Sequence, residues 1–360
     1  MASDTGPSGN TAEQSSSARW KRLWSLHTPD SLRTRAQQLG RTKYIVEGLV
    51  PAASVGMVLG DSGLGKSPLM YQLAICVAAG LPFLGRQTRK SCVLIADFEN
   101  GMADILELVE GLSRFLGLPE HPNSDDLLLW TAQDCSPQYG QADHTLLDML
   151  RDVKPALAII DSLASYDPDA EEKNRTAGKL LRQLRGIARD VGTATYFVHH
   201  RRKQPRKADE GAGPLESANI RRWFEDARGA SALVNGSDVR LGVGEPDISA
   251  VQKDGVALVV RGFGRVRGEI GPLYVARDLD ENSDPTGYRL LVGPELLFNR
   301  EHEQAFERLP RQFSFKEAKQ IYGKSDQPTH NWLQRLLSLG LILKQGRGAY
   351  EKISQSAGSG

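Results

Sequence analysis

The stretch SVGMVLGDSGLGKSPLMYQLAICVAA, residues 54–79, decides the fold of this chain. Residues 54–59 form a short, mostly apolar run that predicts a buried strand, and residues 68–79 predict a helix. Between them, residues 60–67 have the spacing G-x-x-x-x-G-K-S of a phosphate-binding loop. A glycine-rich turn beside an incidental lysine is the alternative. The strand before the loop and the helix after it favour phosphate binding.

Each residue type in this loop has a physical reason to be there. The glycines let the backbone pass close enough for its N–H groups to face phosphates, and Lys66 brings a positive charge to the β/γ oxygens. The Ser67 hydroxyl would bind Mg2+. Pro68 is unusual, but a first helical turn tolerates proline because its N–H groups have no helical partners. The predicted cofactors are ATP and Mg2+, and the predicted nucleotide-binding residues are Gly60, Asp61, Ser62, Gly63, Leu64, Gly65, Lys66, Ser67 and Pro68.

The rest of the chain alternates strands and helices, which predicts an α/β fold with a mostly parallel sheet covered by helices on both faces. Further strands are expected at 91–96, 127–131, 156–160 and 193–198, and further helices at 102–116 and 177–191. Short β runs at 256–260, 273–277 and 288–291 predict antiparallel strands that extend the sheet edge. We expect three parts: a flexible tail or arm (1–42), an ATPase core (43–298), and a small winged-helix-like domain with a disordered C-terminal end (299–360).

Composition narrows the class of protein. Lys and Arg number 45 against 44 Asp and Glu, a net charge of +1, so any nucleic-acid binding must rest on local patches. Three cysteines without a CxxC pair predict reduced thiols rather than disulfides or a zinc site. No apolar run reaches the ~18 residues of a membrane span, and the Ser-rich N-terminus lacks the apolar region of a signal peptide. We expect a soluble, cytoplasmic protein with no membrane partner.

Carboxylates follow two of the predicted strands, at the edge where parallel sheets bind ligands. Asp161 closes the run ALAII and could hold a water molecule on Mg2+; capping the next turn is its alternative role. Asp97 and Glu99 end the strand at 91–96, and alternation puts them on one face. One of them could orient and deprotonate the attacking water, while capping of the following helix is the alternative.

Two histidines follow the strand at 193–198. A histidine at this position can touch the γ-phosphate and report its loss to the segment that follows. The alternative for His199 and His200 is an ordinary hydrogen bond at the strand end. The basic run after them favours the functional interpretation.

Several motifs together resemble one family. In chain order they are EGLVP (47–51), GDSGLGKS (60–67), GLPFLG (80–85), LIADFEN (94–100), AIIDSLAS (158–165), FVHHRRK (197–203) and ARGASALV (227–234). Over residues 43–293 the chain resembles the RecA-like hexameric ATPases, specifically the plasmid replicative helicase RepA and its relatives. The resemblance implies a homo-oligomeric, hexameric ring that hydrolyses ATP at subunit interfaces and moves along single-stranded DNA.

The resemblance also implies roles for individual residues. Glu99 would be the catalytic base, Asp161 the ligand of a Mg2+-bound water, and His200 a γ-phosphate sensor, with Lys66 in the phosphate loop. A cation from the neighbouring subunit usually lies in a K-x-[RN]-x-G stretch, where this chain has VVRGFGRVR (259–267). Arg261 fits the first position, but Phe263 occupies the second. Arg265, or Arg228 of the ARGASAL motif, could act instead; an exposed structural charge is the alternative for each arginine.

Two basic regions are candidates for nucleic-acid binding. The first is a loop that would contact a single-stranded backbone, with a merely solvated loop as the alternative; its cations are Arg201, Arg202, Lys203, Arg206 and Lys207. The second is the domain at 299–360, where residues 300–360 hold ten basic and six acidic residues. Its second helix would present Thr329, His330, Asn331, Gln334 and Arg335, with Lys344 and Arg347 on the wing. This domain would bind duplex DNA or, as the alternative, a replication protein.

The sequence therefore predicts a replicative DNA helicase of a plasmid or mobile element. Three other functions stay open. One is an ATP-dependent regulator that binds duplex DNA without unwinding it. Another is a recombination or repair mediator of RecA type. The last is a signalling ATPase with no nucleic-acid partner.

Overall fold

The computed structural model describes residues 28–39, 42–119, 125–131, 142–201, 213–227, 229, 231–246, 256–265, 268–280, 285–297 and 299–353. The chain divides into two compact units, Met1–Lys43 and Tyr44–Gly360. The first unit contains helix α2 (Pro29–Leu39), an element that was not expected from the sequence. Thr28 caps this helix by accepting a hydrogen bond from the Ser31 N–H (3.3 Å), and proline takes the first helical position.

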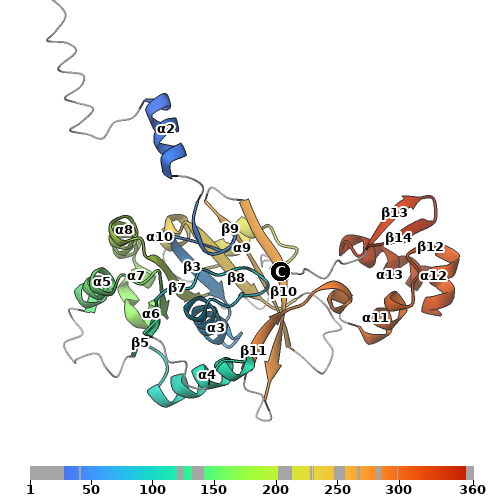
Figure 1. Cartoon of the computed structure of the whole chain (residues 1–360), viewed down its shortest axis with the longest axis horizontal. Coiled ribbons are helices and arrows are strands. Elements are labelled where there is room, and N and C mark those ends of the chain that lie inside the picture. Colours follow the sequence, from blue (N-terminus) through green and yellow to red (C-terminus); the bar gives the residue numbers. More distant parts are fainter. Residues whose placement is uncertain are drawn as a thin grey trace, which may run out of the picture. The chain divides into compact units, whose positions relative to one another are not determined.

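A nine-stranded sheet forms the centre of the second unit (Figure 1). Its order is β11-β10-β9-β8-β3-β7-β6-β4-β5. Strands β5, β4, β6, β7, β3 and β8 are parallel neighbours, and β8 to β11 are antiparallel. The parallel strands are β3 (Val55–Gly60), β4 (Val93–Asp97), β5 (Leu127–Thr131), β6 (Leu157–Asp161), β7 (Ala194–His200) and β8 (Val239–Gly244). The antiparallel strands are β9 (Val256–Gly264), β10 (Gly268–Leu279) and β11 (Pro285–Leu290), while β1 (Tyr44–Val46) and β2 (Val50–Pro51) pair separately.

Helices cover both faces of the sheet, so the predicted α/β class is confirmed (Figure 1). One face packs against α3 (Lys66–Ala79) and α4 (Met102–Phe115). The other face packs against α5 (Ala142–Val153), α6 (Leu163–Tyr166), α7 (Pro168–Glu172), α8 (Asn174–Val191), α9 (Ile220–Glu225) and α10 (Ser231–Gly236). Successive side chains of a strand point to opposite faces of the sheet. On β3, Val58 therefore packs on the face covered by α3 and α4, whereas Met57 and Leu59 pack on the other face.

The antiparallel end of the sheet reaches helix α3. The side-chain amide of Gln72, on α3, donates to the Tyr288 carbonyl of β11 (2.7 Å) and accepts from the Tyr288 N–H (2.7 Å). Gly287 packs so closely on α4 that a Cβ there would lie 2.1 Å from the Phe115 ring. The last strands of this sheet therefore lie beside the helix that follows the phosphate loop.

The C-terminal part has its own small core and a three-stranded sheet of order β12-β14-β13. Its elements are η2 (Gly293–Leu297), α11 (Arg300–Glu307), β12 (Gln312–Ser314), α12 (Phe315–Tyr322), α13 (Asp326–Ser338), β13 (Ile342–Gly346) and β14 (Ala349–Lys352). Ser314 and Glu317 form the predicted capping box at the start of α12. Strand β12 was not expected, because three residues carry no readable periodicity.

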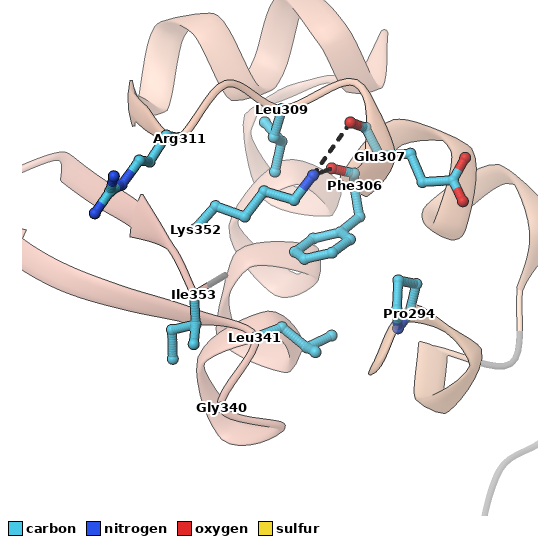
Figure 2. A pocket seen from close by; sticks show the side chains of 9 residues that line it. All are labelled: Pro294, Phe306, Glu307, Leu309, Arg311, Gly340, Leu341, Lys352 and Ile353. Carbon is cyan, nitrogen blue, oxygen red and sulfur yellow. Dashed lines mark hydrogen bonds between the residues drawn. The ribbon is translucent and has the colours of Figure 1, made fainter. Parts of the chain in front are cut away.

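Figure 2 shows a pocket of about 390 Å³ in this part, lined by residues such as Leu309, Leu341 and Ile353. Lys352 crosses it, and its ammonium donates to the carbonyls of Phe306 (3.0 Å) and Glu307 (3.2 Å). These carbonyls end α11, so the lysine satisfies groups that the helix leaves unpaired. Burial lowers the pKa of Lys352. Across the part of the chain that the structure describes, no helix is long and apolar enough to span a membrane.

Candidate nucleotide site

The phosphate loop turns out of β3 and into α3. Gly63 and Gly65 have φ angles of 79° and 84°, in the left-handed region that favours glycine. Gly65 is the N-cap residue of α3, and its carbonyl accepts the first helical bond from the Leu69 N–H (3.2 Å). The helix starts at Lys66, two residues before the predicted start, because the end of the loop already has helical dihedral angles.

Lys66 lies at the centre of the site. Its side chain is only 4% exposed, and its ammonium donates to the Asp61 carbonyl (2.8 Å), which closes the loop. The same nitrogen lies 3.4 Å from His200 Nδ1. Burial lowers the pKa of Lys66, and the negative charges of Asp161 and Asp61 act against that shift. The ammonium is therefore held where it can meet a phosphate.

Asp161 and Asp97 lie side by side on the paired strands β6 and β4. Asp161 is 1% exposed, and among the described residues neither of its carboxylate oxygens has a hydrogen-bond partner. Burial raises the pKa of Asp161 to about 7, although the nearby Ser67 hydroxyl lowers it. Two unsatisfied carboxylate oxygens beside a hydroxyl are suited to a hydrated Mg2+ ion, which prefers oxygen ligands and keeps several waters.

Glu99 lies in the turn after β4, facing the end of β7. Its Oε1 accepts hydrogen bonds from the hydroxyls of Ser162 and Ser165, the latter at 3.1 Å. His200 Nε2 lies 3.9 Å from the same oxygen. The imidazole of His200 is the main reason that the pKa of Glu99 falls to about 2; burial opposes it and the two serines add to it. The carboxylate is ionised and one-third exposed, so water can reach it.

Asp97 holds the turn that carries Glu99. One of its oxygens accepts from the backbone N–H groups of Glu99 and Asn100, both at 2.9 Å. The other accepts from the Tyr71 hydroxyl (2.7 Å) and the Asn100 amide (2.8 Å). Of the two alternatives open for Asp97, the structure therefore supports the structural one. No local pattern indicated Tyr71 as a partner of Asp97, or Ser162 and Ser165 as partners of Glu99.

His199 and His200 are the last residues of β7 rather than residues after it. His199 is fully buried, with Nδ1 3.9 Å from the Glu171 carboxylate. His200 points the other way, between Lys66 and Glu99. Alternation along the strand separates them, so only His200 belongs to the site.

Arg201 does not face solvent as the basic-loop prediction required. Its side chain is 8% exposed, pairs with Asp226 (3.1 Å) and Asp61 (3.5 Å), and stacks on the Trp223 ring (4.3 Å). The carboxylates and the indole compensate its burial, so it ties the phosphate loop to the segment after α9. The other cations of that loop, Arg202, Lys203, Arg206 and Lys207, lie outside the described residues, as does Arg228.

Arg261 is engaged within its own chain. Its guanidinium donates to the carbonyls of Leu215, Glu216 and Ala218 (3.0–3.1 Å) and pairs with Glu269 (3.0 Å). Its side chain is only 14% exposed, which does not suit a residue that reaches into a neighbouring subunit. Arg265 is bonded to the carbonyls of Asn235 and Gly236. In the described chain Arg261 makes these intramolecular contacts, and its role as the trans-acting cation stays a prediction.

The C-terminal candidates divide into two groups. Asn331, Lys344 and Arg347 are exposed, on α13 and on the β13–β14 hairpin. Arg335 is half-buried and turns back to the Leu296 carbonyl (3.5 Å). The expectation for Thr329 is wrong, since this residue is fully buried and its hydroxyl donates to the Ser325 carbonyl (2.8 Å).

The site thus combines a loop shaped for phosphates, a buried lysine, an unsatisfied buried aspartate and an ionised glutamate oriented by a histidine. One comparison with known proteins bears on it. A family model described as an AAA domain matches residues 25–206, half of the chain, and that range holds the loop, Glu99, Asp161 and His200. The chain belongs to this family of AAA-domain proteins and is a P-loop, nucleotide-hydrolysing ATPase.

Proposed function

We propose that this ATPase is a DNA motor: a RepA-like replicative helicase of a plasmid or mobile element, which forms a ring and moves along single-stranded DNA. The observation that carries the proposal is the position of His200, 3.4 Å from Lys66 and 3.9 Å from Glu99, at the last position of β7. The chain continues from it directly into RRKQPRK (201–207). Loss of the γ-phosphate would therefore be transmitted by His200 directly to the basic segment at 201–207.

The residues of the site divide the chemistry of hydrolysis. Lys66 and the loop N–H groups would hold the phosphates of ATP, and Ser67 with Asp161 would hold hydrated Mg2+. The ion supplies charge neutralisation at the β/γ-phosphates. Glu99 orients the attacking water and takes its proton, and Ser162 and Ser165 fix the carboxylate for that task. Asp97 positions Glu99 through the backbone of the turn.

Single-stranded DNA is expected to raise the ATPase rate several-fold, and the substitution Arg202→Ala/Lys203→Ala is expected to remove most of that rise. The basal rate should not change, because the proposal gives these two residues a role on DNA alone. The pair Lys179→Ala/Arg182→Ala, on the exposed side of α8, removes the same charge elsewhere and should leave the stimulation intact. Arg201 is kept, because its loss would detach Asp61 and Asp226. An ATPase rate that single-stranded DNA does not change in any of these proteins would contradict the proposal of a DNA motor.

A strand-displacement assay with a forked duplex distinguishes the helicase from its nearest rival, a duplex-binding regulator that uses ATP to switch its oligomeric state. The rival is favoured by the C-terminal part, whose three helices and β-hairpin resemble a winged helix. The helicase requires ATP-dependent displacement, and size-exclusion chromatography with ATP should give a ring of fixed size. ATP-dependent duplex binding without displacement would support the regulator.

The variant Asn331→Ala/Lys344→Ala/Arg347→Ala tests the C-terminal part. If α13 and the hairpin contact duplex DNA, affinity in 100 mM salt should fall about tenfold or more, because two phosphate-facing cations and one polar contact are lost. The ATPase rate without DNA should stay unchanged. Arg308→Ala/Lys316→Ala removes the same charge from outside α13 and the hairpin, and serves as the control. Unchanged duplex binding by the triple variant would instead assign this part to protein docking.

A further inference from the structure

The β10–β11 hairpin brings a second cation to the phosphate loop. Arg277 on β10 and Tyr288 on β11 are directly opposite each other, so their side chains share one face. Tyr288 is 2% exposed, and its hydroxyl donates to the Gly65 carbonyl (3.0 Å). A Cβ on Gly65 would lie 2.6 Å from the Tyr288 hydroxyl and 3.3 Å from Arg277 Nη1. The guanidinium therefore lies against the N-terminal end of α3.

Arg277 is fixed in place and still has donors to spare. It is hydrogen-bonded to the Tyr288 hydroxyl, and the backbone of Tyr288 is in turn fixed by Gln72 of α3. Its Nε is buried and has no hydrogen-bond partner among the described residues. Because a guanidinium carries five N–H donors, one bond to a tyrosine leaves most of them for another acceptor.

The phosphate loop, meanwhile, lacks one donor. Helix α3 starts at Lys66, so Pro68 is the third residue of its first turn. The N–H groups of this turn have no intrahelical partners and are the ones that an anion meets at a helix N-terminus. Proline has no N–H, so this end of the helix offers one donor fewer than it would with any other residue at 68.

We propose that Arg277 is a nucleotide-binding residue that acts in its own subunit: its guanidinium donates to the α/β-phosphate oxygens and replaces the donor missing at Pro68. This inference rests on the proposed ATP site. A guanidinium suits the task because its planar pairs of N–H groups match two phosphate oxygens, and its charge does not depend on pH in the physiological range. Lys66 and Arg277 would then hold the phosphates from two sides, one from the loop and one from the sheet.

A double-mutant cycle on residues 68 and 277 tests the proposal. MgADP is titrated by calorimetry into the full chain carrying no change, Arg277→Ala, Pro68→Ala, or both. Arg277→Ala is expected to weaken MgADP binding about ten- to hundredfold, the effect of losing a hydrogen bond to a charged group. In the Pro68→Ala background the same change should cost clearly less, because the restored N–H takes over part of the work. Arg289→Ala, an exposed arginine on β11, should bind like the wild type.

The possible results distinguish a failure of the role of Arg277 from a failure of the proposed nucleotide site. A wild-type protein that binds no MgADP overturns the nucleotide site itself. Wild-type affinity in Arg277→Ala, or an equal loss in both backgrounds, overturns the role given to Arg277. Arg277→Lys and the melting temperature without nucleotide exclude simple damage to the fold. The proposal requires Arg277→Lys to regain part of the affinity, and it fails if the affinity loss follows the drop in melting temperature across the set.

Discussion

Glu99→Gln is expected to lower the steady-state ATPase rate by about 10²- to 10⁴-fold and to leave ATP affinity nearly unchanged. Glutamine has the size of the native side chain and can keep the hydrogen bonds from Ser162 and Ser165, but it cannot take a proton from water. Because the pKa of Glu99 is lowered to about 2, the native carboxylate is ionised throughout the working pH range. Protonation of Glu99 should therefore not limit activity above about pH 4.

The measurement pairs ATP turnover with nucleotide titration in the same preparation. Glu107→Gln is the matched control, because Glu107 is exposed on α4. It should behave like the wild type in both assays. Substantial turnover in Glu99→Gln would remove Glu99 from the reaction and would leave Asp97 or Asp161 as the candidate base.

Asp161→Asn is expected to abolish hydrolysis and, at the same time, to stabilise the nucleotide-free protein at pH 8. Burial raises the pKa of Asp161 to about 7 in the folded chain, from an ordinary value of 3.8. The folded state therefore binds a proton between about pH 4 and 7 that the unfolded state has lost. Stability without Mg2+ falls as the pH rises through this window, and above pH 7 the folded protein bears the full cost of a buried charge. At ~1.4 kcal/mol per pKa unit, this rise in pKa corresponds to a gain from asparagine of roughly 4–5 kcal/mol.

Urea unfolding in the absence of Mg2+ and nucleotide, at pH 5 and pH 8, measures this effect. The difference in stability between Asp161→Asn and the wild type should be smaller at pH 5, near the start of this window, than at pH 8, above its end. Asp97→Asn is the informative contrast. Its oxygens accept four hydrogen bonds, so an amide there would oppose a donor and should destabilise the protein. An Asp161→Asn protein no more stable than the wild type at pH 8 would contradict the argument.

Much of the core could be predicted because its signals are local. Residues 54–79 contain strand, loop and helix in one contiguous run, and apolar strands such as ALAII can only be buried. Strand β8 was not predicted, because VRLGVG contains two glycines and an arginine and so lacks an apolar pattern. Its glycines, Gly242 and Gly244, both pack against Leu215, and Gly242 also packs against Trp223. These two side chains occupy the space that a Cβ on either glycine would need. That requirement is tertiary and leaves no local trace.

Within the site, strand ends could be located from the sequence, but partners could not. Glu99 and His200 were expected at the same edge of the sheet, since parallel strands end together. His200 faces Lys66 and His199 faces Glu171 because both belong to β7, where successive side chains point to opposite faces of the sheet. The predicted strand ended two residues earlier, at 198, so the opposite orientation of the two histidines was not expected. The arginines were harder still. The sequence does not distinguish Arg201, Arg261 and Arg277 from one another. Only their packing in the folded chain decides which of them has N–H donors left for a ligand.

The bonds from Tyr288 to Gly65 and to Gln72 have a practical consequence for delimiting this protein. They join β11 to residues up to 223 positions earlier, whereas the family match ends at residue 206. A fragment cut at 206 would contain the phosphate loop, Glu99, Asp161 and His200, and would still lose β8, leaving β3 as an open edge prone to aggregation. It would also strip the cover from one side of α3. The smallest fragment that should be expressed as an ATPase therefore extends through Leu290, well beyond residue 206, where the family match ends.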